Sequence, residues 1–214
     1  MRFRSALLLA ALIGPAVAQT PADELKLLTG PLAVFLRDDS NTPAGVLSAM
    51  RREVEAIVVP AGIHLTWNSG PDAGVYSRIA VMRLQGQCRP EAPFTTSIPT
   101  DRRDSEPLGQ TQVVDGKVLP FADVRCDSVR KVIDRDLRAA ATADRDELLG
   151  RALGRVMAHE LYHVLLRTRS HGRAGLARPV LTSSDLLAVH DTFTPSDEHK
   201  LSGSFVAEAI AGGR

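Results

Sequence analysis

The sequence predicts one domain of the α+β class, in which helices and strands occupy separate runs of the chain. Residues 46–57 and 145–166 carry apolar side chains at helical spacing, whereas residues 77–84 form a short apolar run typical of a strand. Residues 112–119 carry a hairpin signal around an Asp-Gly pair. The chain of 214 residues is long enough for one hydrophobic core and shows no internal repeat.

The start of the chain has the pattern of a signal peptide at residues 1–18. A basic start precedes an unbroken apolar run at residues 6–13, and Ala16-Val17-Ala18 has the small-x-small form of a signal-peptidase site. The run is shorter than the roughly 20 apolar residues that span a bilayer. We therefore expect cleavage after Ala18 and a mature protein that is secreted or periplasmic, without a membrane anchor.

The next segment, residues 19–42, is polar and interrupted by prolines, so it predicts a loosely ordered leader before a domain at residues 43–214. Whether this leader is an inhibitory pro-segment stays open. The chain has 26 basic and 25 acidic residues, and this balance offers no basic excess for nucleic acid. We expect a monomer that does not bind nucleic acid.

The first expected elements of the domain are a helix and two strands. Thr42-Pro43 predicts the helix start, with threonine as N-cap, and Pro60-Ala61-Gly62 predicts the helix end. Residues 63–67 alternate in polarity before a turn and predict a short strand. Residues 77–84 predict the strongest strand, and residues 89–108 predict a long exposed loop.

A hairpin and a helix are expected next. Asp115-Gly116 suits a two-residue turn between residues 112–114 and 117–119. Residues 126–139 carry apolar side chains at helical spacing and predict a helix.

The two cysteines, Cys88 and Cys126, predict a disulfide. An exported protein meets an oxidising compartment, in which two thiols tend to pair. Neither cysteine lies in a CxxC motif, so a zinc–thiolate site is not expected. The disulfide would stabilise the fold by about 3–4 kcal/mol, mainly by restricting the unfolded chain.

The longest expected helix begins near Arg145, where Thr142 or Asp144 can serve as N-cap. Two acidic residues in its first turn would be stabilised by the positive end of the helix dipole. Its apolar stripe comprises Leu149, Leu153, Val156, Met157, Leu161 and Val164.

Three residues near the end of this helix carry the chemistry. His159 and His163 are four residues apart and lie on the same face, so two imidazoles can reach one metal ion. Glu160 occupies a position in the apolar stripe, where a carboxylate is costly unless it has a partner or a task. Beside metal-binding histidines, that task is to accept the proton of a water activated by the metal and to pass it to a leaving amine.

The segment His159-Glu160-Leu161-Tyr162-His163 resembles the HExxH signature of the zincin metallopeptidases. The resemblance covers the end of one helix and its exit. It implies a zincin-like single domain with a mixed sheet, one Zn²⁺ bound by His159 and His163, and Glu160 as the catalytic acid and base. The implied activity is hydrolysis of peptide bonds in a peptide or protein substrate.

The resemblance also implies a third protein ligand. The metzincin branch continues as HExxHxxGxxH, whereas this chain has Leu166 at the glycine position and Arg169 at the last histidine position. His171 follows two residues later, and the small and polar residues around it permit a turn after about Leu166. We therefore expect a lengthened metzincin-like exit, with His171 as the third metal ligand.

Other acids and histidines are weaker candidates. Asp185 and Glu208 could supply the third ligand, as in aspartate- and glutamate-liganded zincins, although Ser184-Asp185 is also typical of a helix N-cap. The remaining histidine positions are expected at the surface: His64, His190 with Asp191, and His199.

The chain departs from the metzincin pattern in one further respect. All four methionines precede the second ligand, so Leu176 is expected in the place of the methionine turn. Neither Tyr76 nor Tyr162 is an obvious group to stabilise an oxyanion.

These departures leave a second hypothesis open, a non-catalytic zinc-binding or interaction protein on a zincin scaffold. For the peptidase, the resemblance implies an edge strand that pairs with extended substrate, and residues 77–84 are the candidate.

Overall fold

The computed structural model describes residues 30–70, 74, 76–91, 106–190 and 192–211. The expected signal peptide and the first part of the expected leader lie outside these ranges, as does most of the expected loop at residues 89–108. Within the described ranges the protein has the expected α+β fold with a mixed sheet, and this sheet has five strands. No helix among the described residues is long and apolar enough to cross a membrane.

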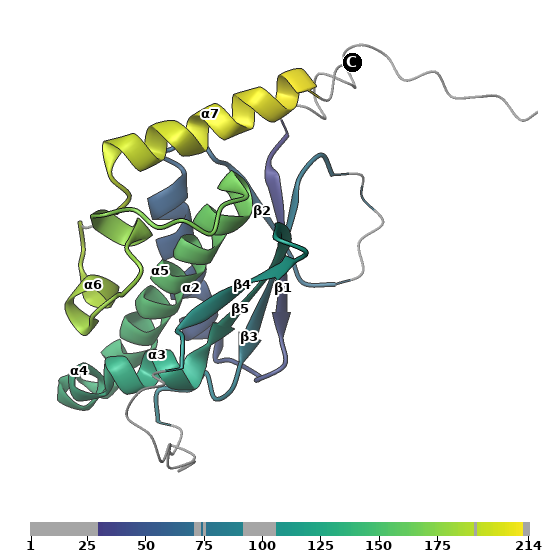
Figure 1. Ribbon diagram of the computed structural model, residues 1–214. Coiled ribbons are helices and arrows are strands. Elements are labelled where there is room, and N and C mark those ends of the chain that lie inside the picture. Colours follow the sequence, from purple (N-terminus) through teal and green to yellow (C-terminus); the bar gives the residue numbers. More distant parts are fainter. Residues whose placement is uncertain (1–29, 71–73, 75, 92–105, 191, 212–214) are drawn as a thin grey trace, which may run out of the picture.

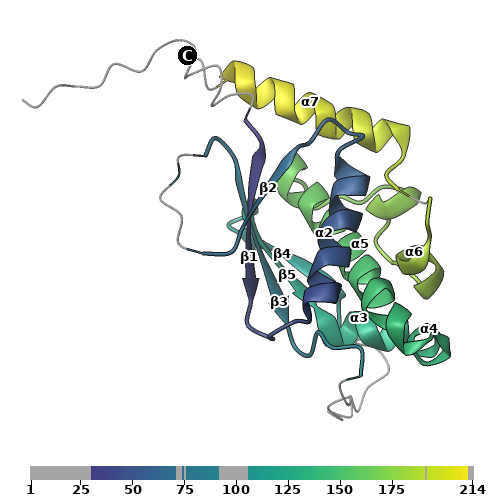
Figure 2. The same ribbon diagram turned by 180° about the vertical axis from the view of Figure 1, so that it is seen from behind.

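The sheet has the strand order β2-β1-β3-β5-β4. Its first four members run parallel to their neighbours, whereas the edge strand β4 is antiparallel to β5. The main helices lie on one side of the sheet (Figures 1 and 2). The strands are β1 (Leu32–Asp38), β2 (Leu65–Asn68), β3 (Ile79–Gln85), β4 (Gly109–Val114) and β5 (Lys117–Arg125).

The structure differs from the expected leader, because part of that segment forms strand β1. Residues 32–38 were assigned to a loosely ordered segment, but they pair with β2 on one side and β3 on the other. Leu32, Val34 and Leu36 are buried in the core. The run is too short to predict a strand alone, and its two parallel partners determine its structure. The folded domain therefore includes β1 and does not begin at residue 43.

The expectation that residues 77–84 form an edge strand is wrong, because most of them belong to the inner strand β3. It pairs with β1 and with β5, so it lies inside the sheet and cannot accept an extended peptide. The antiparallel edge strand is β4, which joins β5 through Asp115 and Gly116. Both turn residues have positive φ angles, 49° and 74°, as the expected two-residue hairpin turn requires.

Helix α2 (Ala44–Val58) matches the expected helix, but its start differs. Its N-cap is Pro43, without a side-chain hydrogen bond. Thr42 was expected as the cap, yet its backbone N–H and hydroxyl donate to the Asp38 carboxylate at 2.9 and 2.8 Å. Thr42 thus binds the last residue of β1 and does not cap α2.

The expected helix at residues 126–139 is divided in two. Helices α3 (Cys126–Val132) and α4 (Asp134–Ala139) meet at Ile133, whose φ and ψ of −99° and 13° are not helical. Ile133 is fully buried, so the break directs its side chain into the core. The Cys88–Cys126 disulfide is confirmed and fixes the first residue of α3.

Helix α5 (Arg145–Leu166) is the longest helix among the described residues and packs against both α2 and the sheet. It follows a short 3-10 turn, Thr142–Asp144, and neither side chain of the two expected caps bonds to the helix start. Gly150 and Gly154 face α2, and a Cβ on Gly154 would lie 2.7 Å from the Met50 carbonyl oxygen. These glycines let the two helices approach closely, and this contact positions α5 against the sheet.

The chain after α5 returns across the end of this helix. It forms the 3-10 turn Gly175–Ala177, helix α6 (Ser183–Leu187) and helix α7 (Pro195–Ala211). Helix α7 lies across the end of the helical layer (Figure 1). Side chains of α7 are described as far as Ser204.

Candidate metal centre

Three histidines meet at the end of α5. His159 and His163 lie on the helix, and His171 lies on the loop that follows it. One ring nitrogen of each histidine lies within 4.8 Å of one ring nitrogen of each of the other two. The Nε2 atom of His163 is 3.1 Å from that of His159 and 3.2 Å from that of His171. The structure thus brings together the three histidines that the sequence predicts as metal ligands.

Backbone carbonyl groups determine which nitrogens of the two helical histidines face the cluster. The Nδ1 atom of His159 lies 2.8 Å from the Leu176 carbonyl oxygen, and that of His163 lies 2.9 Å from the Thr168 carbonyl oxygen. A carbonyl oxygen only accepts hydrogen bonds, so each Nδ1 must carry the hydrogen. In the neutral imidazole, Nε2 then presents a lone pair to the cluster.

These lone pairs suit a cation between them. Burial lowers the pKa of His159 to about 4, and it lowers the pKa of His163 as well, so both rings are neutral at pH 7. Two neutral acceptors 3.1 Å apart repel each other because no hydrogen lies between them. Nitrogens that share a tetrahedral zinc ion at 2.0–2.1 Å lie about 3.3 Å apart. The three-histidine cluster could therefore hold a metal ion.

The turn that brings His171 to the helix starts where the sequence predicts it. Arg167 ends α5 in the left-handed conformation, with φ and ψ of 48° and 40°. The next N–H, of Thr168, bonds to the His163 carbonyl oxygen at 3.2 Å. Farther on, the Gly172 N–H donates to the Ala177 carbonyl oxygen at 2.7 Å, which closes the loop. His171 itself is exposed, so the cluster is accessible from this side.

The loop also places Leu176 against the cluster. Leu176 is buried, and its carbonyl oxygen orients His159. Side-chain patterns in the sequence do not reveal this backbone contact.

Glu160 lies beside the cluster in sequence but contacts the sheet. Its residue is 4% exposed, and its Oε2 atom accepts a hydrogen bond of 2.6 Å from the Thr111 hydroxyl on β4. A Cβ on Gly109, also on β4, would lie 2.6 Å from Oε1. Burial raises the pKa of Glu160 to about 7, although hydrogen bonds from Thr111 lower it. Such a carboxyl group can exchange protons near neutral pH.

Sequence patterns did not reveal the roles of Thr111 and Gly109. The hairpin signal around Asp115-Gly116 gives the pairing of β4 with β5. It does not show that β4 packs along α5, because that contact depends on how the sheet meets the helix. An uncharged strand with a glycine and a threonine was the only local signal.

The alternative ligand Asp185 has a structural role. Its carboxylate accepts bonds of 2.8 and 2.7 Å from the backbone N–H and hydroxyl of Thr182, and it pairs with Arg178. Thr182, not Ser184, is the N-cap of α6, and Asp185 completes a capping box. His64, His190 and His199 are exposed, as expected. Asp191 and the side chain of Glu208 lie outside the described residues.

Tyr162 packs beneath the cluster. Its ring stacks on Phe193 at 5.5 Å and meets the edge of His163 at 5.7 Å. Its hydroxyl donates to the Asp197 carboxylate at 3.4 Å, so it is engaged by α7. The other tyrosine, Tyr76, packs edge to face on Phe35 of β1.

No protein-family model matches this chain, and no curated protein matches its sequence. The chemistry of the site is therefore the basis for the function.

Proposed function

We propose that this protein is an exported, zincin-like metallopeptidase that hydrolyses peptide bonds with one Zn²⁺. The observation that carries the proposal is the pair of imidazoles held by backbone carbonyls, with their Nε2 atoms directed at each other. Three neutral imidazoles suit Zn²⁺, and His159, His163 and His171 would leave a fourth position open. Bound there, zinc would lower the pKa of a water and polarise a substrate carbonyl group.

The residues around the site suit the remaining steps. Glu160 would accept the proton of the attacking water and deliver it to the amine that leaves when the C–N bond breaks. Its pKa of about 7 permits both transfers near neutral pH. The Thr111 hydroxyl would hold the carboxylate in place from the edge strand.

The position of strand β4 at the edge of the sheet suits the binding of an extended substrate. It is an edge strand whose one partner in the described sheet is β5, and it lies beside α5. An extended peptide could therefore add to β4 as a further strand, with its scissile bond near the histidines. Export is supported by the disulfide, which fits an oxidising compartment.

A second candidate function is a zinc-binding protein without catalysis. The burial of Glu160 and its short bond to Thr111 favour this candidate, because a carboxylate engaged by the sheet is less free to reach a water.

Metal analysis and proteolysis of the purified mature protein separate the two candidates. The peptidase binds one zinc per chain and cleaves a mixed peptide library, and a chelator stops cleavage until zinc is restored. Glu160→Gln keeps the zinc but abolishes cleavage, whereas the control Asp185→Asn keeps both. One zinc per chain with no cleavage of any peptide would favour the binding protein, and no zinc would refute both.

A further inference from the structure

The loop around His171 is rich in arginine and has no acidic residue. From Leu161 to Ser184 the chain contains four arginines and neither aspartate nor glutamate. This excess is local, because the whole chain has 26 basic and 25 acidic residues. The four arginines are Arg167, Arg169, Arg173 and Arg178.

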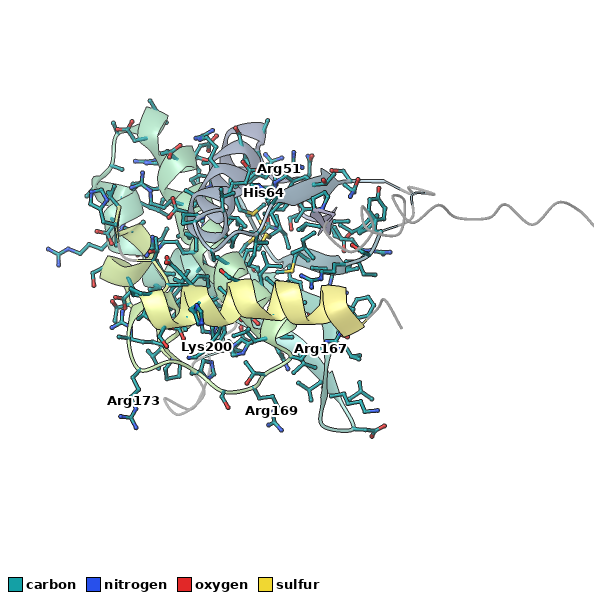
Figure 3. All side chains as sticks on the ribbon, turned by 90° about the horizontal axis from the view of Figure 1, so that it is seen from above. Arg51, His64, Arg167, Arg169, Arg173 and Lys200 are labelled. Atoms are coloured by element: carbon teal, nitrogen blue, oxygen red, sulfur yellow. A yellow bond between two sulfur atoms is a disulfide. The ribbon has the colours of Figure 1, made fainter. Side chains whose placement is uncertain are left out.

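Two of these arginines present their charge beside the metal centre. Arg178 is paired with Asp185, which compensates its charge. Arg169 and Arg173 are exposed and lie two residues before and two residues after His171. Two peptide units span at most about 7 Å, so both backbones are close to the third metal ligand. Figure 3 shows their side chains extending outward on the same side of α7.

The groups near Arg169 and Arg173 add little further charge to this face. Lys200 of α7 also lies near this face (Figure 3), but it pairs with Asp197 at 2.8 Å. Asp197 is 3% exposed, and its carboxylate accepts hydrogen bonds from Lys200 and Thr194 beneath Gly172 of the loop, where it is shielded from solvent. Strand β4, where a peptide would pair, has no charged side chain. The strand itself therefore adds no charge beside a bound peptide, whereas the loop that carries His171 adds Arg169 and Arg173.

On the basis of the proposed function, we infer that Arg169 and Arg173 select peptides that carry carboxylates close to the scissile bond. A guanidinium binds a carboxylate through two parallel N–H···O bonds, which gives direction as well as attraction. An extended peptide advances about 3.3–3.6 Å per residue, so side chains within a few residues of the metal reach the loop. The substrate class is an acidic peptide.

The test measures binding separately from cleavage. Zinc-loaded Glu160→Gln protein is titrated with tetramethylrhodamine-labelled decapeptides of alanine, serine and glutamine, which carry either two glutamates or two glutamines at the same positions. A third peptide has neutral side chains and a free terminal carboxylate, and a fourth is its amide. Fluorescence anisotropy at low and high salt gives the affinities.

The glutamate peptide should bind about tenfold more tightly at low salt, and salt should reduce the difference. Adding Arg169→Glu and Arg173→Glu should remove the preference. The matched control adds Lys131→Glu and Arg135→Glu, which are exposed on α3 and α4, and should retain it. If the free terminal carboxylate gives the larger difference, the loop recognises a peptide end; if the side chains do, it recognises acidic residues.

Equal affinities for acidic and neutral peptides, or no binding of either, would overturn the inference. So would an equal loss of preference in the control, because general charge would then explain the result. Wild-type protein incubated with the same peptides tests the proposed function independently. Selective binding without cleavage of these peptides or of the mixed library would refute the peptidase and leave the arginine loop as a site for acidic peptides.

Discussion

Thr111 on the edge strand donates its hydroxyl hydrogen to the Glu160 carboxylate at 2.6 Å, and this bond joins β4 to α5, the helix that carries His159 and His163. Residues 49 positions apart in the chain thus meet where an extended substrate and a catalytic carboxylate would both be needed. The bond is mostly buried, so its loss leaves an acceptor with little access to water.

Thr111→Val should therefore weaken the protein more than Thr111→Ser. Valine keeps the shape but removes the donor, which should lower the free energy of unfolding by about 1–3 kcal/mol. Serine keeps the hydroxyl and should lose less stability and retain more peptide hydrolysis. Urea denaturation and initial rates of cleavage measure both effects. Identical behaviour of the two variants would show that the hydroxyl bond contributes nothing.

The raised pKa of Glu160 predicts a pH-dependent difference in stability. Because the pKa rises from 4.5 to about 7 on folding, the stabilising contribution is complete below pH 4.5 and is lost as pH rises through 7. In metal-free protein, Glu160→Gln should therefore gain about 2–3 kcal/mol of stability relative to wild type between pH 5 and pH 8. The lowered pKa of His159 affects both proteins and cancels in the comparison.

Urea denaturation in the presence of a chelator at these two pH values measures that difference. Glu106→Gln is the control, because the Glu106 side chain is 71% exposed. It should show little change between the two pH values. A difference for Glu160→Gln that stays constant from pH 5 to pH 8 would contradict the buried carboxyl group.

Metal binding should stabilise the fold through the three histidines. At a free zinc concentration 100 times the dissociation constant, the gain is about 2.7 kcal/mol. His171→Ala should reduce the gain strongly, whereas His64→Ala, at an exposed position, should leave it unchanged. Thermal denaturation with and without zinc measures the shift. Equal shifts for the two variants would place the ion away from His171.

The sequence predicted the motif helix, its end and its three histidines, because spacing along one helix and a short turn determines them. It missed relationships that depend on distant parts of the chain. Residues 32–38 became a strand because two parallel neighbours pair with them. Residues 77–84 look like an edge strand only until both partners are known. Thr111, Gly109 and the Leu176 carbonyl enter the site through packing between separate elements.

Gly109 offers the sharpest test of how closely β4 approaches the Glu160 carboxylate. Because a Cβ at this position would lie 2.6 Å from Oε1 of Glu160, Gly109→Ala must displace either the carboxylate or the strand. We expect a loss of about 1–3 kcal/mol in stability. The rate of hydrolysis should fall more than the zinc affinity, because the ring nitrogens of His159 and His163 are oriented by the Leu176 and Thr168 carbonyl oxygens and not by β4. Gly70→Ala is the control, because a Cβ on Gly70 meets nothing within 4 Å. Urea denaturation, zinc titration and cleavage rates are compared for the two variants. A Gly109→Ala protein with unchanged hydrolysis would show that Glu160 acts from a position away from β4.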